Sequence, residues 1–468
     1  MENNGLNLTA PQLVPALDSR FRPAVLANRD FRTQARAARN PLPVRLAFEQ
    51  SDGSVCHFAA EVFAENDSRA AANFIFIERL VKFLLWSRGA CRIHFAGPAT
   101  ICTRLQTHYR DTPAGQFDST LIGERVYGSP IRILHAENGH LPAERARTRA
   151  LGRHLDGCRI GFDLGGSDRK VAAVMDGKVV FSEETAWDPC RQPDPQYHFD
   201  GIMDSLKSAA AHLPRVDAIG GSAAGVFVNN QVKVASLFRS VPRDAFDRRV
   251  KDLFFEIQQT WGGVPLEVVN DGEVTALAGS MSLAKNAVLG LALGTSLAAG
   301  YVTREGGITS WLNELAFAPV DYNPHAPRDE WSGDYGVGAQ YLSQQAVGRL
   351  LVGAGIAVEP GVPLPEQLRQ VQTLMADGDE RARTVYETLG TYLGYAVAHY
   401  ADFYDFDHVL ILGRVTSGTG GGLIVKGATE VLKAGFPDLA GRITFHMPDE
   451  KEKRHGQAVA AASLPQRG

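Results

Sequence analysis

The chain has 468 residues, too many for one hydrophobic core, so we expect roughly two to four structural units. Hydrophobic residues make up 44% and charged residues 21% of the chain, proportions typical of globular and not of disordered proteins. The net charge of -4 is small for this length, so composition indicates neither a nucleic-acid nor a membrane partner.

Cysteine spacing and apolar runs exclude further classes. The five cysteines are far apart and form no C-x-x-C pair, which favours reduced structural thiols over zinc or redox sites. Residues 1–20 lack the basic start and apolar run of a signal peptide. The longest apolar stretch, Phe74–Trp86, is interrupted by Glu78, Arg79 and Lys82 and is too polar to cross a membrane. We therefore expect a cytoplasmic protein.

The N-terminal part begins with residues 1–40, which carry prolines and arginines with little periodicity. We expect an extended arm here, with arginines that are solvated or paired within the molecule. Apolar and polar residues then alternate over 44–48 and 55–63, on either side of a turn at 51–53. This pattern predicts a β-hairpin.

Helical periodicity follows the hairpin. Apolar residues at helical spacing predict a helix over 70–86 that ends at Gly89. A short strand is predicted at 91–95 and a second helix at 98–109. Residues 41–150 therefore predict a small α+β domain.

The remaining chain alternates strands, glycine turns and helices, which indicates an α/β architecture. At the first glycine turn, a bend between two strands exposes backbone amides and a hydroxyl that suit phosphate oxygens. Asp163 at the end of the first strand suits Mg²⁺ held through water. An ordinary hairpin whose aspartate caps the turn is the alternative. The candidate nucleotide-binding residues of this turn are Asp163, Gly165, Gly166, Ser167 and Lys170.

Two later turns have the same character. The apolar strand 288–293 ends in Gly294, Thr295 and Ser296, which again offer amides and hydroxyls to an anion. A second apolar strand ends at Gly413 and Arg414, ahead of a glycine-rich helix start that lets a nucleotide approach the backbone. The first two turns indicate a duplicated half, with a nucleotide in a cleft between two lobes.

A carboxylate suited to catalysis lies between these turns. A strand over 264–270 delivers Asn270 and Asp271 to its carboxyl end, and a helix follows. Asp271 is positioned to take a proton from a sugar hydroxyl during phosphoryl transfer, while Asn270 hydrogen-bonds a neighbouring hydroxyl. The alternative is that Asp271 only caps the helix.

The order and spacing of these motifs resemble the fold shared by actin, hexokinase and the heat-shock ATPases, and most closely the ROK sugar kinases. The resemblance covers about residues 159–460. It implies a two-lobed α/β (ribonuclease H-like) kinase module over 155–465, with lobes at about 155–270 and 271–465, in addition to the N-terminal α+β domain. It also implies that Ser222, in the loop 221–227, and Glu314 bind the sugar beside Asn270.

Two departures from the family pattern concern zinc and the sugar. Phe317 stands where the family has a zinc-ligand histidine, and Trp331–Ser343 replaces the cysteine-rich zinc segment. Ala339 stands where the family has a second sugar-binding glutamate. The resemblance implies ATP and Mg²⁺ as cofactors. Because the zinc ligands are missing, we expect no structural zinc.

The motifs together predict an ATP-dependent sugar kinase that transfers the γ-phosphoryl group of Mg-ATP to a hydroxyl of a hexose or hexose derivative, with Asp271 as general base. The alternative is a catalytically silent sugar-binding or regulatory protein of the same family. Residues 1–150 show no helix-turn-helix with a basic recognition helix, so DNA binding is disfavoured. The expected partner is a small-molecule sugar, and a homodimer is left open.

Overall fold

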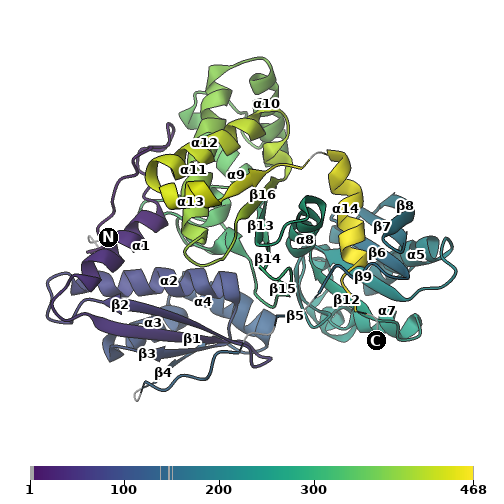
Figure 1. Ribbon diagram of the computed structural model, residues 1–468, viewed down its shortest axis with the longest axis horizontal. Helices are drawn as coiled ribbons and strands as arrows, with labels where there is room; N and C mark the ends of the chain where they lie inside the picture. Colours follow the sequence, from purple (N-terminus) through teal and green to yellow (C-terminus); the bar gives the residue numbers. More distant parts are fainter. Residues whose placement is uncertain (1–4, 137–138, 146–147, 150, 449, 467–468) are drawn as a thin grey trace.

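The computed structural model describes residues 5–136, 139–145, 148–149, 151–448 and 450–466, and all structural statements concern these residues. Three sheets of four or more strands form three bodies (Figure 1). We call residues 24–135 the N-terminal domain and the bodies that follow the first and second lobes. No helix in the described part of the chain is long and apolar enough to cross a membrane.

The N-terminal domain has a four-stranded sheet in the order β2-β1-β3-β4, covered by helices. The predicted hairpin is confirmed, since β1 and β2 pair in antiparallel register, and Gly89 ends α2 with a φ of 77°. Helix α2 is apolar on most sides because it is buried on most sides. The elements are α1 Ala24–Arg36, β1 Leu42–Glu49, β2 Val55–Val62, η1 Ala70–Ala72, α2 Asn73–Arg88, β3 Arg92–Ala96, α3 Ala99–Asp111, α4 Pro113–Asp118, η2 Ser119–Val126 and β4 Arg132–His135.

Part of the segment expected to be extended is helical instead. Helix α1 begins directly after Pro23, which occupies the N-cap position, and three of its arginines pair with carboxylates elsewhere in the fold. Arg29 and Arg32 pair with Asp402, so the expected internal pairing of these arginines is confirmed for these two.

The first lobe is built on a five-stranded sheet in the order β12-β9-β6-β7-β8. Strand β6 pairs antiparallel with β7 and parallel with β9, and β9 pairs parallel with β12. Its elements are β6 Cys158–Leu164, β7 Asp168–Met175, β8 Lys178–Ala186, η3 Pro189–Arg191, α5 Pro195–Ala210, β9 Ala218–Ala223, β10 Val226–Val228, β11 Gln231–Val234, η4 Ser236–Phe238, α6 Arg243–Ala245, η5 Phe246–Val250, α7 Leu253–Thr260, β12 Leu266–Asn270 and α8 Asp271–Leu283.

The second lobe repeats this topology in the order β17-β16-β13-β14-β15, with β5 added at the edge. Strand β13 pairs antiparallel with β14 and parallel with β16, as β6 does with β7 and β9, which confirms the predicted duplication. The elements are β5 Thr148–Arg149, β13 Val288–Leu293, β14 Leu297–Val302, β15 Ile308–Thr309, η6 Leu315–Phe317, η7 Gly338–Gln340, α9 Gln344–Gly353, α10 Leu364–Ala376, α11 Glu380–Tyr400, β16 His408–Leu412, η8 Arg414–Thr416, α12 Thr419–Gly435, α13 Pro437–Arg442, β17 Thr444–His446 and α14 Glu450–Ala462.

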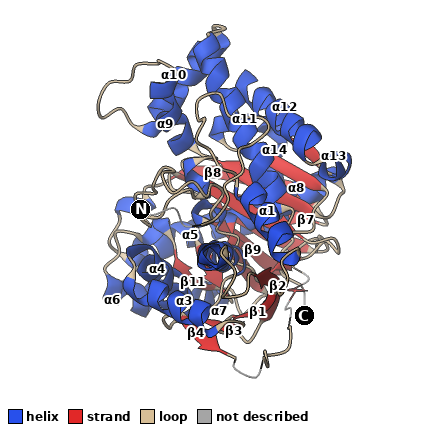
Figure 2. Cartoon of the chain, turned by 90° about the vertical axis from the view of Figure 1, so that its left-hand side faces the viewer, coloured by secondary structure: helices blue, strands red, loops and turns tan. Residues whose placement is uncertain are grey.

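Helices α8 and α14 join the two lobes. Helix α8 follows the first sheet but packs on β13 and β14, while α14 follows the second sheet but packs on β6, β7 and β9. The two helices also contact each other, whereas α9, α10, α11 and α12 gather on the outer part of the second lobe (Figure 2). The start of α8 therefore lies where the lobes meet.

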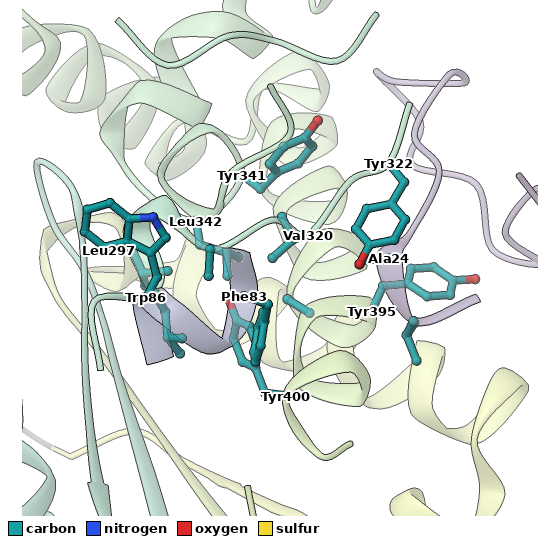
Figure 3. Close-up of a cluster of buried hydrophobic side chains, with 14 of the residues drawn as sticks. Ala24, Phe83, Trp86, Leu297, Val320, Tyr322, Tyr341, Leu342, Tyr395 and Tyr400 are labelled. Atoms are coloured by element: carbon teal, nitrogen blue, oxygen red, sulfur yellow. The ribbon is translucent and has the colours of Figure 1, made fainter. Parts of the chain in front are cut away.

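The hydrophobic cores show which bodies belong together. The first lobe has a core of its own, whereas the N-terminal domain and the second lobe share one continuous core. Phe83 and Trp86 of α2 lie among side chains of the second lobe, including Leu297 and Tyr400 (Figure 3). The N-terminal domain is thus part of the second lobe in packing terms.

Candidate active site

The carboxyl ends of three adjacent parallel strands gather the first group of predicted residues. In the registers of β6, β9 and β12, Asp163 lies opposite Ser222, and Asn270 lies opposite Ala223 one residue further along. The Ser222 hydroxyl donates to Asp163 Oδ1 over 2.7 Å. This edge of the sheet is where ligands of open α/β sheets bind.

Asn270 and Asp271 begin helix α8. The Asn270 side chain caps the helix, since its Oδ1 accepts from the Gly272 amide at 2.7 Å while its Nδ2 donates to the Gly225 carbonyl at 2.7 Å. Asp271 Oδ1 accepts from the same amide at the longer distance of 3.0 Å. The capping that competed with a catalytic role for Asp271 is therefore carried mainly by Asn270.

The helix start is pressed against the second lobe. A side chain at Gly272 would collide with the Ala299 carbonyl of β14, and one at Gly300 would collide with the Gly272 carbonyl. This close approach of backbones requires glycine at both positions. It fixes Asp271 at the boundary between the lobes.

Three predicted carboxylates interact electrostatically. Burial raises the pKa of Asp163, and burial together with the charge of Asp163 raises the pKa of Asp271 to about 6. Burial and then the charge of Asp271 raise the pKa of Glu314 to about 7. The charge of Asp163 thus acts on Asp271, and that of Asp271 acts on Glu314.

A fourth carboxylate extends this series and was missed in the sequence. Glu273 is buried, and burial raises its pKa to about 8 although the Asn313 side chain and the Tyr301 amide donate to it. Asn313 in turn accepts from the Tyr404 hydroxyl at 2.9 Å. Glu273 follows Asp271 by two residues and Asn313 precedes Glu314, so proximity to the motifs was the only available signal.

The first glycine turn is open to solvent. Gly166 and Ser167 are exposed, and the Ser167 hydroxyl donates to Asp168 Oδ2 at 2.9 Å. Lys170 Nζ lies 3.0 Å from Asp168 Oδ1 and 3.8 Å from Asp163 Oδ2. The turn therefore presents an ammonium group beside the Asp163 carboxylate.

The other two turns lie side by side, because β13 and β16 are parallel neighbours. Gly413 has a φ of 102°, and a side chain there would collide with the Leu293 backbone, so only glycine fits. Gly294 donates to the Ser296 carbonyl, and Thr295 and Ser296 are exposed.

Charge links these turns to the first lobe. Burial opposes ionisation of Asp168, but its pKa is lowered by Lys170, by the Ser167 hydroxyl and, to the smallest extent, by the exposed Arg414 guanidinium. The charge of Arg414 thus acts on the first glycine turn across the boundary between the lobes. Exposed hydroxyls, Lys170 and Arg414 form a donor set that suits a polyphosphate, and Asp163 suits a hydrated cation.

A cavity adjoins two of the four carboxylates. It is lined by Asn270, Glu273 and Glu314, by the β10–β11 hairpin of the first lobe, and by residues 308–312 of the second lobe. Gln50, Asp52 and Tyr127 of the N-terminal domain complete its wall. A cavity of mixed apolar and polar lining that contains carboxyl groups of raised pKa, here Glu273 and Glu314, is a candidate substrate site.

The position of the family's zinc ligand is filled by aromatic packing. The Phe317 ring lies 4.5 Å from the Trp86 ring and 5.5 Å from the Phe117 ring, measured between centroids. Ala339 is buried, and its carbonyl accepts from the Ser343 hydroxyl. Among the described residues, no group of three or more His, Cys, Asp or Glu side chains is arranged to hold a metal ion.

Comparison with known proteins gives a result at the level of structure. No protein-family model matches the sequence, and no curated protein matches it. A ROK family transcriptional regulator, a homologue of the E. coli MLC protein, aligns over 66% of this chain and 78% of its own, with 20% identity and a TM-score of 0.54. The ROK hexokinase of Thermus thermophilus aligns over 65% of this chain and 97% of its own, with 16% identity and a TM-score of 0.51. The chain has the ROK fold.

The ROK fold confirms the α/β, two-lobed, actin-like class expected from the order of the motifs. Its two lobes are the duplicated sheets, and Asp271 lies where they meet. One of the two similar structures is a kinase and the other a regulator, so the fold is compatible with both functions. The choice between them depends on the residues of the site.

Proposed function

We propose that the protein is an ATP-dependent sugar kinase, which transfers the γ-phosphoryl group of Mg-ATP to a hydroxyl of a hexose or hexose derivative. The observation that carries the proposal is the environment of Asp271. This carboxylate begins helix α8 at the boundary between the lobes, next in sequence to Asn270, which lines the cavity, and burial raises its pKa to about 6. A base with a pKa just below neutrality is ionised at neutral pH and still accepts a proton effectively.

The residues around Asp271 would divide the work of substrate binding. Asp271 would accept the proton of the attacking hydroxyl as its oxygen bonds to phosphorus. Asn270 and Glu314 line the cavity beside it and would hydrogen-bond neighbouring hydroxyls. Ser222, predicted to bind the sugar, is fully buried and does not line the cavity; because it donates to Asp163, it would instead orient that carboxylate.

The nucleotide and its cation would be held by the three turns. Mg²⁺ neutralises charge on the phosphates when it is bound. Asp163 would hold the hydrated ion, and the side chains of Lys170 and Arg414 would bind phosphate oxygens. The glycines at 165, 294 and 413 would let the phosphates approach the backbone closely. Ser167, Thr295 and Ser296 add exposed hydroxyls, and Gly166 leaves the backbone accessible.

A catalytically silent sugar-binding or regulatory protein is the second candidate. It is favoured by the similarity in fold to the ROK family transcriptional regulator. In this case the cavity beside Glu314 would bind a sugar, and the glycine turns would have no nucleotide to hold. Both candidates share the sugar site and differ in their response to Mg-ATP.

A coupled assay of ADP release distinguishes the two candidates. Hexoses, amino sugars and their derivatives are supplied with Mg-ATP, and release without sugar is subtracted. Sugar-dependent ADP release that disappears in the Asp271→Asn variant supports the kinase. A sugar that raises the melting temperature without any sugar-dependent ADP release refutes the kinase and leaves the silent binder.

A further inference from the structure

Helix α2 of the N-terminal domain is anchored to the second lobe by buried ion pairs. Arg79 lies 2.6 Å from Glu78 and 3.1 Å from Asp334, and Lys82 lies 2.9 Å from Asp334 and 3.0 Å from Asp118. These side chains are at most 3% exposed. Burial opposes ionisation of Asp334, but the two cations outweigh it and hold its pKa below the usual range.

The carboxyl end of α2 is bonded to the loop that carries Glu314. The Glu314 amide donates to the Trp86 carbonyl over 2.9 Å, and the Asn313 amide donates to the Ser87 carbonyl over 3.0 Å. Carbonyls at the end of a helix have no partner within the helix, so the loop satisfies them. Asn313 has a φ of 51°, a conformation that costs energy unless its surroundings impose it.

Gln50 closes the same junction from the hairpin side. Its Nε2 donates to the Arg88 carbonyl at 2.7 Å and to the Ser310 carbonyl at 3.0 Å, which joins the end of α2 to the start of the loop. The side chain is only 6% exposed and lines the cavity beside Glu314. Just after the loop, the Phe317 ring packs on Trp86.

We propose that the N-terminal domain is a working part of the sugar site, in which the end of helix α2 and Gln50 hold loop 310–314 and so fix the position of Glu314. Gln50 is a positioning residue, since it acts through the loop. The proposal rests on Glu314 being a sugar ligand, as in the proposed function. It holds for a kinase and for a silent sugar binder alike.

The first test replaces Gln50 with leucine, which keeps its volume and removes both hydrogen bonds. Gln50→Leu should raise the KM for the sugar that the ADP-release screen identifies by about tenfold or more, because two buried carbonyls lose their donor and the loop loosens. The KM for Mg-ATP should stay within about twofold, since the glycine turns are elsewhere. The rise in melting temperature caused by sugar should shrink in parallel.

Gln106→Leu is the matched control. Gln106 of the same domain donates to a backbone carbonyl, that of Ile133, at 2.9 Å and does not line the cavity. This variant should lose some stability and keep the wild-type KM for sugar. A Gln50→Leu variant that loses stability as Gln106→Leu does, with sugar KM within twofold of wild type, overturns the proposal.

Hydrogen exchange on the unaltered protein tests the junction without a variant. The amides of Asn313 and Glu314 should exchange as slowly as amides of α2, because both are bonded to its carbonyls. Exchange at the rate of unprotected loop amides overturns the proposal, even if Gln50→Leu fails to fold. A different outcome is slow exchange and a sugar-dependent thermal shift without sugar-dependent ADP release. That outcome refutes only the kinase and leaves the proposed role of the N-terminal domain intact.

Discussion

Replacement of Asp271 by asparagine separates a catalytic base from a helix cap. The folded protein raises the pKa of Asp271 from 3.8 to about 6, first through burial and then through Asp163. The ionised carboxylate is therefore less favourable in the folded than in the unfolded chain. The protonated carboxyl group contributes to the free energy of unfolding, and this contribution is fully present below about pH 4 and is lost as the pH rises through about 6.

The magnitude follows from the pKa values. A change from 3.8 to about 6 corresponds to at most about 3 kcal/mol at pH 7.5. Asp271→Asn removes this penalty while it keeps a group that tolerates a helix start. We expect the variant to melt at a higher temperature than wild type at pH 7.5 and at a similar temperature at pH 4.

Activity should change in the opposite direction. A general base contributes about 10²- to 10⁴-fold to turnover, or roughly 2.7 to 5.5 kcal/mol, so kcat should fall by at least about 10²-fold. The KM for sugar should change little, because Asn270 and Glu314 remain. In the wild type, kcat/KM should decline as the pH falls below about 6, since protonated Asp271 accepts no proton, and the variant should lose this dependence.

Coupled ADP release and thermal melting from pH 4 to 8 measure both effects. Asp379→Asn is the control, because Asp379 caps the exposed start of α11 and its pKa is lowered to about 2, mainly by a hydrogen bond from Arg381. This control should be slightly less stable at neutral pH and fully active. If Asp271→Asn keeps wild-type turnover and melts lower at pH 7.5, Asp271 is a cap and the reasoning is wrong.

Three further outcomes are expected. Mg-ATP at a hundredfold excess over its Kd should stabilise the folded protein by about 2.7 kcal/mol and raise the melting temperature by a few degrees. Asp163→Ala should remove most of this rise and leave the rise caused by sugar unchanged. An unchanged Mg-ATP effect contradicts the role of Asp163. Protein purified without a metal-binding tag should contain no zinc after dialysis against a chelator, because Phe317 replaces a ligand; one retained equivalent would refute this. Asp334→Ala should lower the free energy of unfolding in urea by about 3–5 kcal/mol, because buried Arg79 and Lys82 lose a counter-charge. The control Glu359→Ala, on the surface, should have little effect. A loss below about 1 kcal/mol for Asp334→Ala would show that the remaining carboxylates suffice to compensate the two cations.

Much of the local structure was encoded in short stretches of sequence. Alternating residues and a turn gave the hairpin of β1 and β2, and Gly89 gave the end of α2. The apolar strand before Gly294 and the residues after Ser296 correspond to β13 and β14. These features depend on periodicity and on turn residues, which act between neighbours in the chain.

The order of the motifs also carried the architecture. Repetition of a strand, a glycine turn and a second strand at Asp163 and Gly294 indicated the duplicated sheets. Parallel strands bring their carboxyl ends to one edge, so the grouping of Asp163, Ser222 and Asn270 followed once the topology was known.

Only the tertiary structure decided how distant charges are used. In the sequence, Arg79 and Lys82 merely interrupted an apolar run, yet they are buried against Asp334, some 250 residues away in the chain. The raised pKa of Glu314 likewise depends on burial and on Asp271, and Gln50 reaches the cavity only because the N-terminal domain shares its core with the second lobe. Local propensity contains no information about such contacts, because desolvation and Coulomb energy depend on distances that the packing of whole domains sets.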